Sequence, residues 1–267
     1  MIEYNSIVTQ IMQVSPIMKI IRVKPDGWEF PEYKAGQFVA LGLTGFESRC
    51  PEATEQYPPL DDPNEIIKRA YSIASSSSQE FIEFYITLVH SGALTPRLFN
   101  LEIGDRVWMG KKATGMFTLD EVDAEQNIIL VATGTGVAPF MSMLRSNALT
   151  RKGKIIVIHG AANSWDLGYS SELELLQSIF PNFHYYPTIK MPEKEPSSWN
   201  GETRFIEEIL EAGTIEEKFG LKPQPDNTHF FLCGNPKMIE AVTYVMAKEG
   251  FKVHKRKDPG QIHIEEF

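Results

Sequence analysis

The sequence predicts two folds in succession: an antiparallel β-barrel over residues 1–122, then a doubly wound α/β domain with a parallel sheet over residues 123–267. Segments of the first half that favour strands are short and separated by Gly, Pro, Asp and Ser, as in antiparallel barrels. The second half alternates nearly continuous apolar runs with helical stretches, which is typical of parallel sheets covered on both faces. A chain of 267 residues, 42% of them apolar, is long enough for two ordinary cores.

In the first half, β-branched and aromatic segments predict the barrel strands, and Pro96 marks a short helix. Residues 44–68 are polar and rich in proline, and they predict a long surface loop. The pattern changes after residues 120–126, where the domain boundary is expected. The expected barrel strands are residues 16–23, 36–43, 81–89 and 105–110.

In the second half, apolar runs long enough to be buried on both faces of a sheet alternate with helical periodicity. This alternation predicts a Rossmann-like, doubly wound domain. The expected strands are residues 128–132, 154–159, 183–189 and 229–233. The expected helices are residues 139–147, 171–179, 203–211 and 236–249.

Composition excludes several classes of protein. No apolar run reaches the length of a membrane span, and residues 1–10 lack the pattern of a secretion signal, so we expect a cytoplasmic protein. Two cysteines, Cys50 and Cys233, are too few for an iron–sulfur cluster, and the six histidines show no spacing typical of a metal site. The net charge of −9 argues against general nucleic-acid binding.

A basic cluster near the C-terminus contrasts with this acidic background. Two interpretations stay open: a solvated surface strand, or a docking patch that attracts an acidic partner. The cluster consists of Lys248, Lys252, Lys255, Arg256 and Lys257.

The segment over residues 128–140 is the most informative part of the chain. A buried strand ends at Ala132, Gly134 and Gly136 follow, and a helix is expected to begin at Pro139. Glycines let the backbone approach a pyrophosphate, and the helix start holds its negative charge. Pro139 replaces the third glycine of the full dinucleotide fingerprint, so a purely structural turn is the alternative.

A second strand end agrees with a dinucleotide site. Residues 231–237 again pass from a buried strand through Gly234 to a helix that starts at Pro236. Two such turns at the carboxyl ends of strands frame one crevice, where open α/β sheets bind ligands. Cys233 lies at that edge, either touching a nicotinamide or serving as a small buried hydrophobe.

Selectivity between NAD and NADP depends on the ends of the next strands. The strand that ends near His159 carries no acidic residue for a ribose diol, which favours NADP(H). Lys190 and Arg204 follow the third strand and are candidates for contact with a 2′-phosphate, with ordinary surface charge as the alternative.

The first half carries its own candidate for an anion site. Arg69 and Tyr71 share one face of an expected strand and Ser72 lies on the other, so Arg69 is placed to pair with a phosphate and Tyr71 to lie against a flat ring. Thr95 is expected to cap the helix that starts at Pro96, which adds a second anion-holding helix start.

Together these motifs resemble the ferredoxin–NADP reductase family, most of all its bacterial flavodoxin/ferredoxin reductases with a short C-terminal tail. The resemblance covers essentially the whole chain. The motifs, in order, are residues 69–72, 92–96, 114–117, 133–139 and 233–236.

The resemblance implies an FAD-binding barrel followed by an NADP-binding α/β domain. Ser72 would lie near flavin N5, Cys233 near the nicotinamide, and the aromatic Phe267 over the flavin; these three are the implied catalytic residues. The implied FAD contacts are Arg69, Ala70, Tyr71, Ser72, Tyr85, Ala93, Leu94, Thr95, Thr135, Glu266 and Phe267. The implied NADP contacts are Gly134, Gly136, Val137, Pro139, Ala161, Ala162, Lys190, Arg204, Cys233, Gly234, Asn235, Pro236 and Lys237.

The chain also departs from that pattern. Ala162 stands where an arginine for the 2′-phosphate is common, Lys190 replaces a more usual arginine, and Phe267 replaces a more usual tryptophan. Electron transfer between NADP(H) and ferredoxin or flavodoxin is the expected activity, with transient electrostatic docking of the carrier. The alternatives are a flavin or quinone reductase, the reductase component of a larger complex, and a cofactor-free binding module.

Overall fold

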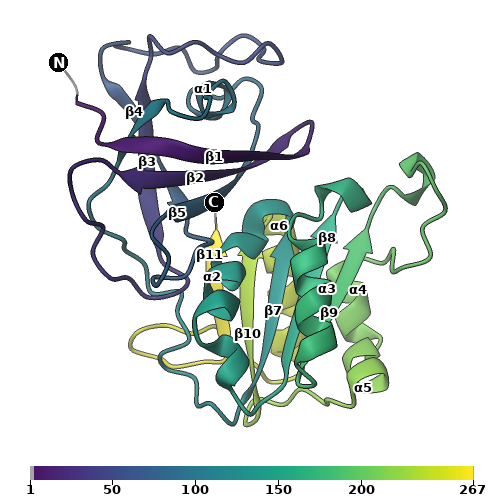
Figure 1. Cartoon of the computed structure of the whole chain (residues 1–267). Coiled ribbons are helices and arrows are strands. Elements are labelled where there is room, and N and C mark those ends of the chain that lie inside the picture. The colour runs from purple at the N-terminus through teal and green to yellow at the C-terminus, as the bar shows by residue number, and fades with distance from the viewer. Residues whose placement is uncertain (1–2, 267) are drawn as a thin grey trace. The chain divides into compact units, whose positions relative to one another are not determined.

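The computed structural model describes residues 3–266 of the chain. The chain divides into two compact units (Figure 1). The first consists of Met1–Thr118 and Met141–Ser146, and the second of Leu119–Phe140 and Asn147–Phe267. Among the described residues, no helix is both long and apolar enough to cross a membrane.

The first unit is a six-stranded antiparallel sheet with the order β4-β3-β6-β1-β2-β5. The sheet is barrel-like but not closed, because no ladder of the described residues pairs its end strands β4 and β5. A short helix, α1 (Thr95–Phe99), belongs to this unit. The strands are β1 (Ser6–Ser15), β2 (Met18–Pro25), β3 (Phe38–Thr44), β4 (Ile66–Ser72), β5 (Ile82–Thr87) and β6 (Arg106–Met109).

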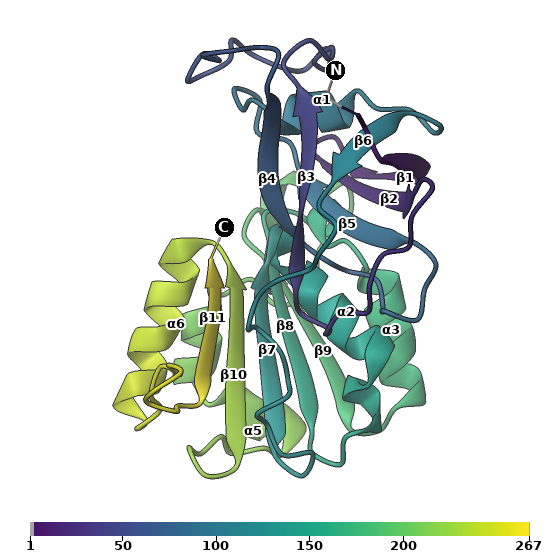
Figure 2. The same ribbon diagram turned by 90° about the vertical axis from the view of Figure 1, so that its left-hand side faces the viewer.

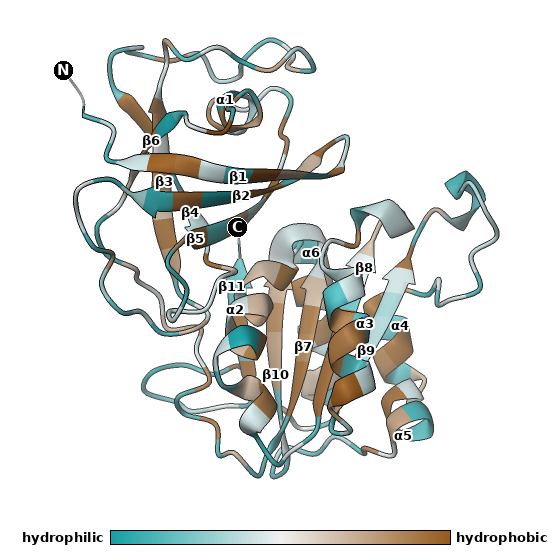
Figure 3. Cartoon of the chain, viewed as in Figure 1, coloured by the Kyte–Doolittle hydropathy of each residue, from teal (hydrophilic) through white to brown (hydrophobic). Residues whose placement is uncertain are grey.

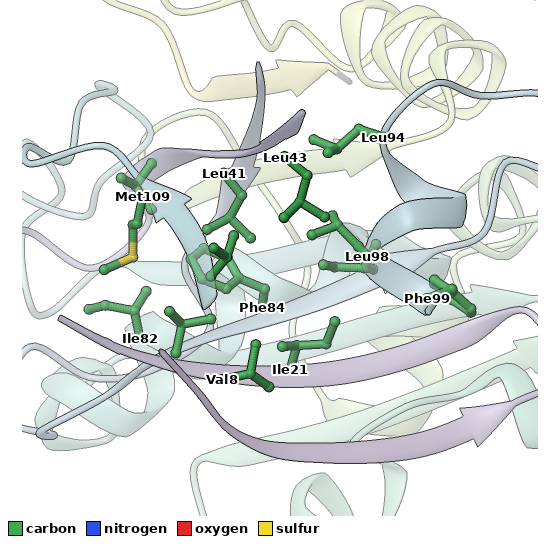
Figure 4. Packing of buried hydrophobic residues seen from close by; sticks show 14 of the residues in the cluster. Val8, Ile21, Leu41, Leu43, Ile82, Phe84, Leu94, Leu98, Phe99 and Met109 are labelled. Carbon is green, nitrogen blue, oxygen red and sulfur yellow. The ribbon is translucent and has the colours of Figure 1, made fainter. Parts of the chain in front are cut away.

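The core of the first unit follows the two-residue period of its strands. Alternate residues of β3 and β5 point inward, because successive side chains of a strand face opposite sides of the sheet. Leu94 and Leu98 of the α1 region pack into the same cluster (Figure 4). The inward residues of the two strands are Val39, Leu41, Leu43, Ile82, Phe84 and Ile86.

The second unit is a five-stranded parallel sheet with the order β11-β10-β7-β8-β9. Its central strands are apolar along most of their length, as expected for strands covered on both faces (Figure 3). Helices α4 and α6 pack their apolar faces on one side of the sheet, and α3 lies on the other (Figure 2). The strands are β7 (Asn127–Thr133), β8 (Ile155–Ala161), β9 (Phe183–Ile189), β10 (Thr228–Gly234) and β11 (Ile262–Glu266).

The α-helices of the second half are α2 (Ala138–Ser146), α3 (Ser170–Ile179), α4 (Ile206–Glu211), α5 (Thr214–Phe219) and α6 (Pro236–Lys248). Short 3₁₀ helices accompany them: η1 (Gly134–Val137), η2 (Ala148–Thr150), η3 (Ser164–Asp166) and η4 (Pro192–Lys194). The α4 helix starts at Ile206 rather than near residue 203, because Thr203 and Arg204 bond through their backbone N–H groups to the Glu202 side chain.

The predicted fold class is confirmed, whereas strands β1 and β11 and helix α5 were not foreseen, and β4 was expected only around Arg69 and Tyr71. The polar residues at the start of the chain conceal β1, whose outward side chains are partly exposed. The predicted loop over residues 44–68 was too long by four residues, since β3 ends at Thr44 and β4 begins at Ile66. The edge strand β11 and the short helix α5 carry too few apolar residues to stand out in the sequence.

Candidate functional site

The strand order of the second unit reverses between β7 and β10. From β7 the chain builds outward through β8 and β9, and it then returns to place β10 and β11 on the other side of β7. Open α/β sheets bind ligands where the carboxyl ends of two such strands diverge. Both glycine turns predicted from the sequence lie there: Gly134–Val137 follows β7, and Gly234 ends β10.

The two turns touch through their backbones. A Cβ atom on Gly136 would lie 2.2 Å from the carbonyl oxygen of Cys233, so this position has no room for a side chain. Gly234 has a φ of +129°, which non-glycine residues rarely adopt, and a Cβ there would meet the Thr133 hydroxyl at 2.3 Å. Both glycines are therefore required by the close approach of the turns.

Two helical segments start at this edge of the sheet, η1 with α2 after β7 and α6 after β10. The start of α6 is capped by Asn235, whose side-chain oxygen accepts from the backbone N–H of Lys237 at 2.9 Å. The backbone N–H of Asn235 donates to the Thr133 hydroxyl at 2.8 Å, which ties the second turn to the end of β7. Neither α2 nor α6 has an acidic residue in its first turn, so a bound phosphate would meet an uncompensated positive helix end.

The first of these helices starts earlier than the sequence predicted. The 3₁₀ helix η1 begins at Gly134 and leads directly into α2 at Ala138, so Pro139 is the second residue of α2 and not the beginning of the helical segment. The two glycines thus belong to the helical segment itself.

His159 supports the first glycine turn, a role that the sequence analysis missed. It is fully buried on β8, and its Nε2–H donates to the carbonyl oxygen of Gly134 at 2.9 Å. Burial lowers the pKa of His159 to about 4, so the ring is neutral at pH 7. The signal available in the sequence was a histidine inside an otherwise apolar strand, which implies a buried partner.

This histidine predicts a pH dependence of stability. In the unfolded chain the imidazole has its ordinary pKa of 6.5, so between pH 6.5 and 4 the unfolded chain binds a proton that the folded chain does not. Stability is therefore complete above pH 6.5 and falls as the pH falls towards 4, with about 2 kcal/mol lost from this group between pH 7 and pH 5. Urea unfolding at both pH values measures the loss.

A variant isolates the contribution of His159 from that of other groups. His159→Gln keeps an N–H donor for Gly134 but cannot titrate. Between pH 7 and pH 5 its free energy of unfolding should therefore fall by less than that of the wild type. Replacement of the exposed His90 by Gln is the control and should leave the loss unchanged. An equal loss in wild type and His159→Gln would show that the buried imidazole does not titrate in the expected range.

The candidates for a 2′-phosphate site gather at the carboxyl ends of β8 and β9. The backbone N–H of Lys190 donates to the carbonyl oxygens of Ala161 and Ala162, at 3.1 and 3.2 Å. The Nζ atom of Lys190 donates to the carbonyl oxygen of Thr203 and lies 3.4 Å from the centre of the Phe205 ring. The backbone of Lys190 thus adjoins Ala162, and its positive charge lies beside Thr203 and Phe205.

Arg204 lies nearby, but its guanidinium is engaged by Glu202. The two side chains form a fork, with Nε–Oε1 and Nη2–Oε2 distances of 3.0 and 2.5 Å, and the Tyr186 hydroxyl donates to the same carboxylate. The hydrogen bonds from Arg204 hold the pKa of Glu202 well below its usual range, and the carboxylate raises the pKa of Arg204. Lys190 is therefore the less compensated of the two cations.

Cys233 is fully buried at the end of β10, and its Sγ lies 4.0 Å from a carboxylate oxygen of Glu265. Burial raises the pKa of this thiol well above its ordinary value, with a smaller contribution from Glu265. The sulfur is thus a neutral thiol at physiological pH and packs as a small hydrophobe beside the glycine turns.

The end of the chain returns to the same edge of the sheet. Strand β11 runs parallel to β10, with Glu266 paired to Gly234, so the predicted contact residue Glu266 adjoins the second turn. Phe267, predicted to cover the flavin, lies outside the described residues. The basic cluster is elsewhere: its five residues lie between the end of α6 at Lys248 and the start of β11 at Ile262, and so at the amino edge, opposite the glycine turns.

The first unit carries a cavity of about 480 Å³, a volume typical of sites for small ligands. Arg69 lines it together with Ala93, Leu94 and Thr95, so the fold brings these predicted FAD contacts together. Among residues 3–266, the backbone N–H groups of Ala93 and Leu94 have no acceptor, and Thr95, first in its helix, has no acceptor within it. These groups fit the oxygens of a pyrophosphate.

Arg69 is available as a cation for such a group. Its side chain is exposed and donates to the carbonyl oxygen of Lys68, and it forms no ion pair with a carboxylate of the described chain. The unbroken register of β4 places Arg69 opposite Leu41 and Tyr71 opposite Val39, which confirms that Arg69 and Tyr71 share a face. Tyr71 is half-buried, with its ring edge-on to Phe84 at 6.3 Å.

The other predicted FAD contacts of the first unit lie on strands β4 and β5. Ala70 is exposed on β4, and Ser72 ends that strand opposite Phe38. Tyr85 is buried on β5, and its hydroxyl donates to the Met18 sulfur at 3.0 Å. It faces away from the core residues Phe84 and Ile86, on the opposite side of β5.

One local prediction was wrong. Thr95 does not cap α1: the cap position belongs to Leu94, and Thr95 is the first helical residue. The Thr95 hydroxyl instead accepts from the backbone N–H of Val89 at 2.9 Å and so braces the segment that precedes the helix. The Thr95 hydroxyl therefore bonds to the preceding segment and not to the helix end. A capping rule based on residue type alone cannot predict this choice of partner.

Comparisons with known proteins agree with this geometry. The family model of the oxidoreductase NAD-binding domain matches residues 130–244. The chain is 34% identical over 237 residues to the flavodoxin/ferredoxin–NADP reductase of Buchnera aphidicola subsp. Baizongia pistaciae, with 88% of each chain covered. It is 32% identical over 208 residues to the Escherichia coli K12 enzyme of the same name, covering 78% of this chain and 76% of that one.

Among solved structures, a ferredoxin NADP+ reductase from Neisseria gonorrhoeae with bound FAD and NADP has the same fold. The TM-score is 0.83 at 23% sequence identity, and the match covers 100% of this chain and 99% of that one.

Proposed function

The chain belongs to the flavodoxin/ferredoxin–NADP reductase family, and we propose on that basis that it transfers electrons between NADP(H) and a one-electron carrier protein, with FAD as its cofactor. One observation carries the proposal: each unit has its own helix start, with no acidic residue in its first turn, for the phosphates of a dinucleotide. When bound, FAD supplies the redox chemistry, taking a hydride from NADPH and releasing electrons singly, while the protein supplies orientation and field.

In the first unit, Arg69 and the backbone of Ala93–Thr95 would hold the FAD pyrophosphate. Arginine suits this role because its planar fork matches phosphate oxygens. Tyr71 and Tyr85 would flank the flavin, and Ala70 and Ser72 would approach it from β4, with Ser72 near the reacting atom. Thr135, Glu266 and Phe267 are proposed as further FAD contacts from the second half of the chain.

In the second unit, the turn from Gly134 to Pro139 would hold the NADP pyrophosphate, because its N–H groups form a helix start at a strand end. Gly234 and the Asn235–Lys237 cap would border the nicotinamide side of the dinucleotide. Cys233, a neutral thiol, would fill space beside the nicotinamide rather than exchange a proton with it. Val137 and Ala161 complete the proposed contacts.

The carrier is proposed to be ferredoxin or flavodoxin, docking transiently through charge. The location of the basic cluster at the amino edge of the parallel sheet argues against it as the point of electron exit, because the proposed nucleotide site is at the other edge. We place the enzyme in the cytoplasm, and cell fractionation tests that location.

Steady-state kinetics with different acceptors tests the proposed function. NADPH should support reduction of ferredoxin or flavodoxin with a kcat/KM well above that for free flavin or quinone. If only free flavin or quinone is reduced, the chain is a diffusible-acceptor reductase instead. A requirement for another subunit would identify it as a component of a larger complex.

Preference for NADPH over NADH should depend on Lys190. Lys190→Ala removes the cation that lies beside Thr203 and Phe205, after β9, so the KM for NADPH should rise about tenfold while that for NADH stays constant, since only NADPH carries the 2′-phosphate. Lys222, which precedes β10 and so lies near the opposite edge of the sheet, gives the control Lys222→Ala. An equal rise for both nucleotides would assign Lys190 a structural role only.

A further inference from the structure

The cavity of the first unit has a second wall that neither the predicted motifs nor the family assignment explains. Besides Arg69 and Gly92–Thr95, it is lined by Tyr57, Pro58, Pro59, Leu60, Asp61, Asp62 and Glu65. These residues belong to the connection over residues 45–65, between β3 and β4, which the sequence suggested was a plain surface loop.

This connection is fixed to the proposed pyrophosphate segment by backbone hydrogen bonds. The N–H groups of Thr54 and Tyr57 donate to the carbonyl oxygens of His90 and Ser91, at 3.0 and 2.9 Å. Its own ends are joined as well, because the N–H of Gly45 donates to the carbonyl oxygen of Pro63 at 3.0 Å. The wall is therefore held at a defined place beside residues 89–95.

Two arginines add to this attachment. Arg49 donates to the carbonyl oxygens of Thr54, His90 and Gly92. The second, Arg97, is 5% exposed and donates to the Gln56 side chain at 2.9 Å and to the Gly45 carbonyl oxygen at 2.8 Å. Both bind carbonyl groups rather than a carboxylate, so both leave positive charge near the segment proposed to hold phosphates.

The lining of the cavity carries charges of both signs. Arg69 and Lys68 line it, and Arg49 and Arg97 lie behind the segment Gly92–Thr95. The carboxylates of Asp61, Asp62 and Glu65 belong to the same lining and suit the hydroxyl donors of a ribose. Tyr57, 79% exposed, is held next to Gly92 by its backbone bond to Ser91 and offers an aromatic face to a base.

We propose that residues 57–65 of this connection form the binding wall for the adenosine half of FAD. The cavity then takes the pyrophosphate at Arg69 and Ala93–Thr95, the ribose at the carboxylates of Asp61, Asp62 and Glu65, and the adenine against Tyr57. This proposal rests on the proposed function, since it assumes that FAD is the cofactor. It assigns to an apparently plain loop the part of the site that distinguishes FAD from FMN.

The test compares the release of two flavins from the full chain. Tyr57→Ala should accelerate FAD loss from the holoprotein and raise its dissociation constant about tenfold, the effect expected when a base loses an aromatic stacking partner. Binding of FMN to the FAD-depleted chain should not change, because FMN has no adenosine. Phe46→Ala is the matched control: Phe46 lies in the same connection and is 69% exposed, but does not line the cavity.

A second measurement keeps the test valid if Tyr57→Ala folds poorly. AMP added to the FAD-depleted wild-type chain should shift the NMR amide signals of residues 57–65 and weaken FAD binding by competition. Unchanged FAD affinity in Tyr57→Ala, equal weakening of FAD and FMN, or AMP shifts confined to other residues would overturn the proposal. If the wild-type chain binds neither flavin, the proposed function itself is wrong. If the chain binds FAD with an affinity that Tyr57→Ala and AMP do not change, only the proposed adenosine wall is wrong.

Discussion

Gly136→Ala should lower kcat/KM for NADPH by about a hundredfold or more while leaving FAD bound. The added Cβ would lie 2.2 Å from the Cys233 carbonyl oxygen, a distance that no relaxed side chain adopts, and the nearby atoms are backbone and cannot rotate away. The turn must therefore move off β10 by about an ångström, and displacements of that size in a binding site cost about a hundredfold in rate. Stopped-flow reduction by NADPH measures the loss.

The matched control for this variant is Gly110→Ala. Gly110 has no positive φ, and a Cβ there would meet nothing closer than 3.4 Å, so its rate and FAD content should equal those of the wild type. If Gly136→Ala is reduced by NADPH at the wild-type rate, the contact between the two glycine turns has no bearing on nucleotide binding.

Glu83→Leu should destabilise the protein by about 3–5 kcal/mol, the cost of leaving buried charges without their partner. The Glu83 carboxylate is 0% exposed and bonds at 2.6 Å to both Arg22 and Arg145, whose side chains are 27% and 16% exposed. Arg145 belongs to the stretch Met141–Ser146 that groups with the first unit, so the loss should affect that unit. Urea unfolding at pH 7 measures it.

An exposed ion pair of the same unit gives the comparison. Glu80 pairs with Lys24 at 2.8 Å, but its side chain is 88% exposed, so Glu80→Leu should leave the unfolding midpoint almost unchanged. A loss of similar size in both variants would mean that burial adds nothing to the Glu83 pair.

Much of the fold could be predicted from the sequence because its signals are local. The apolar runs of β7, β8 and β10, and the glycines that follow β7 and β10, identify buried parallel strands with nucleotide turns by residue type alone. The strand order, with its reversal between β7 and β10, was not predicted and comes from the structure. Arg69 and Tyr71 were placed on one face by the two-residue period of a strand.

The features of the fold and site that were not predicted depend on contacts between residues far apart in the sequence. The bond from His159 to Gly134 joins positions 25 residues apart. The grouping of Met141–Ser146 with the first unit follows from Arg145 and from Ser142, whose hydroxyl donates to the Ser75 carbonyl oxygen at 2.7 Å. The loop over residues 45–65 has no periodicity, and its order comes from Arg49 and Arg97, which bind carbonyl groups that no sequence rule identifies.

The most direct test of the account is anaerobic addition of NADPH to the purified chain, followed by its visible absorbance. The account predicts a yellow protein that retains FAD and whose flavin band is bleached by NADPH, then restored when oxidised ferredoxin or flavodoxin is added. A colourless protein that cannot retain added FAD, or a bound flavin that NADPH does not reduce, would contradict it.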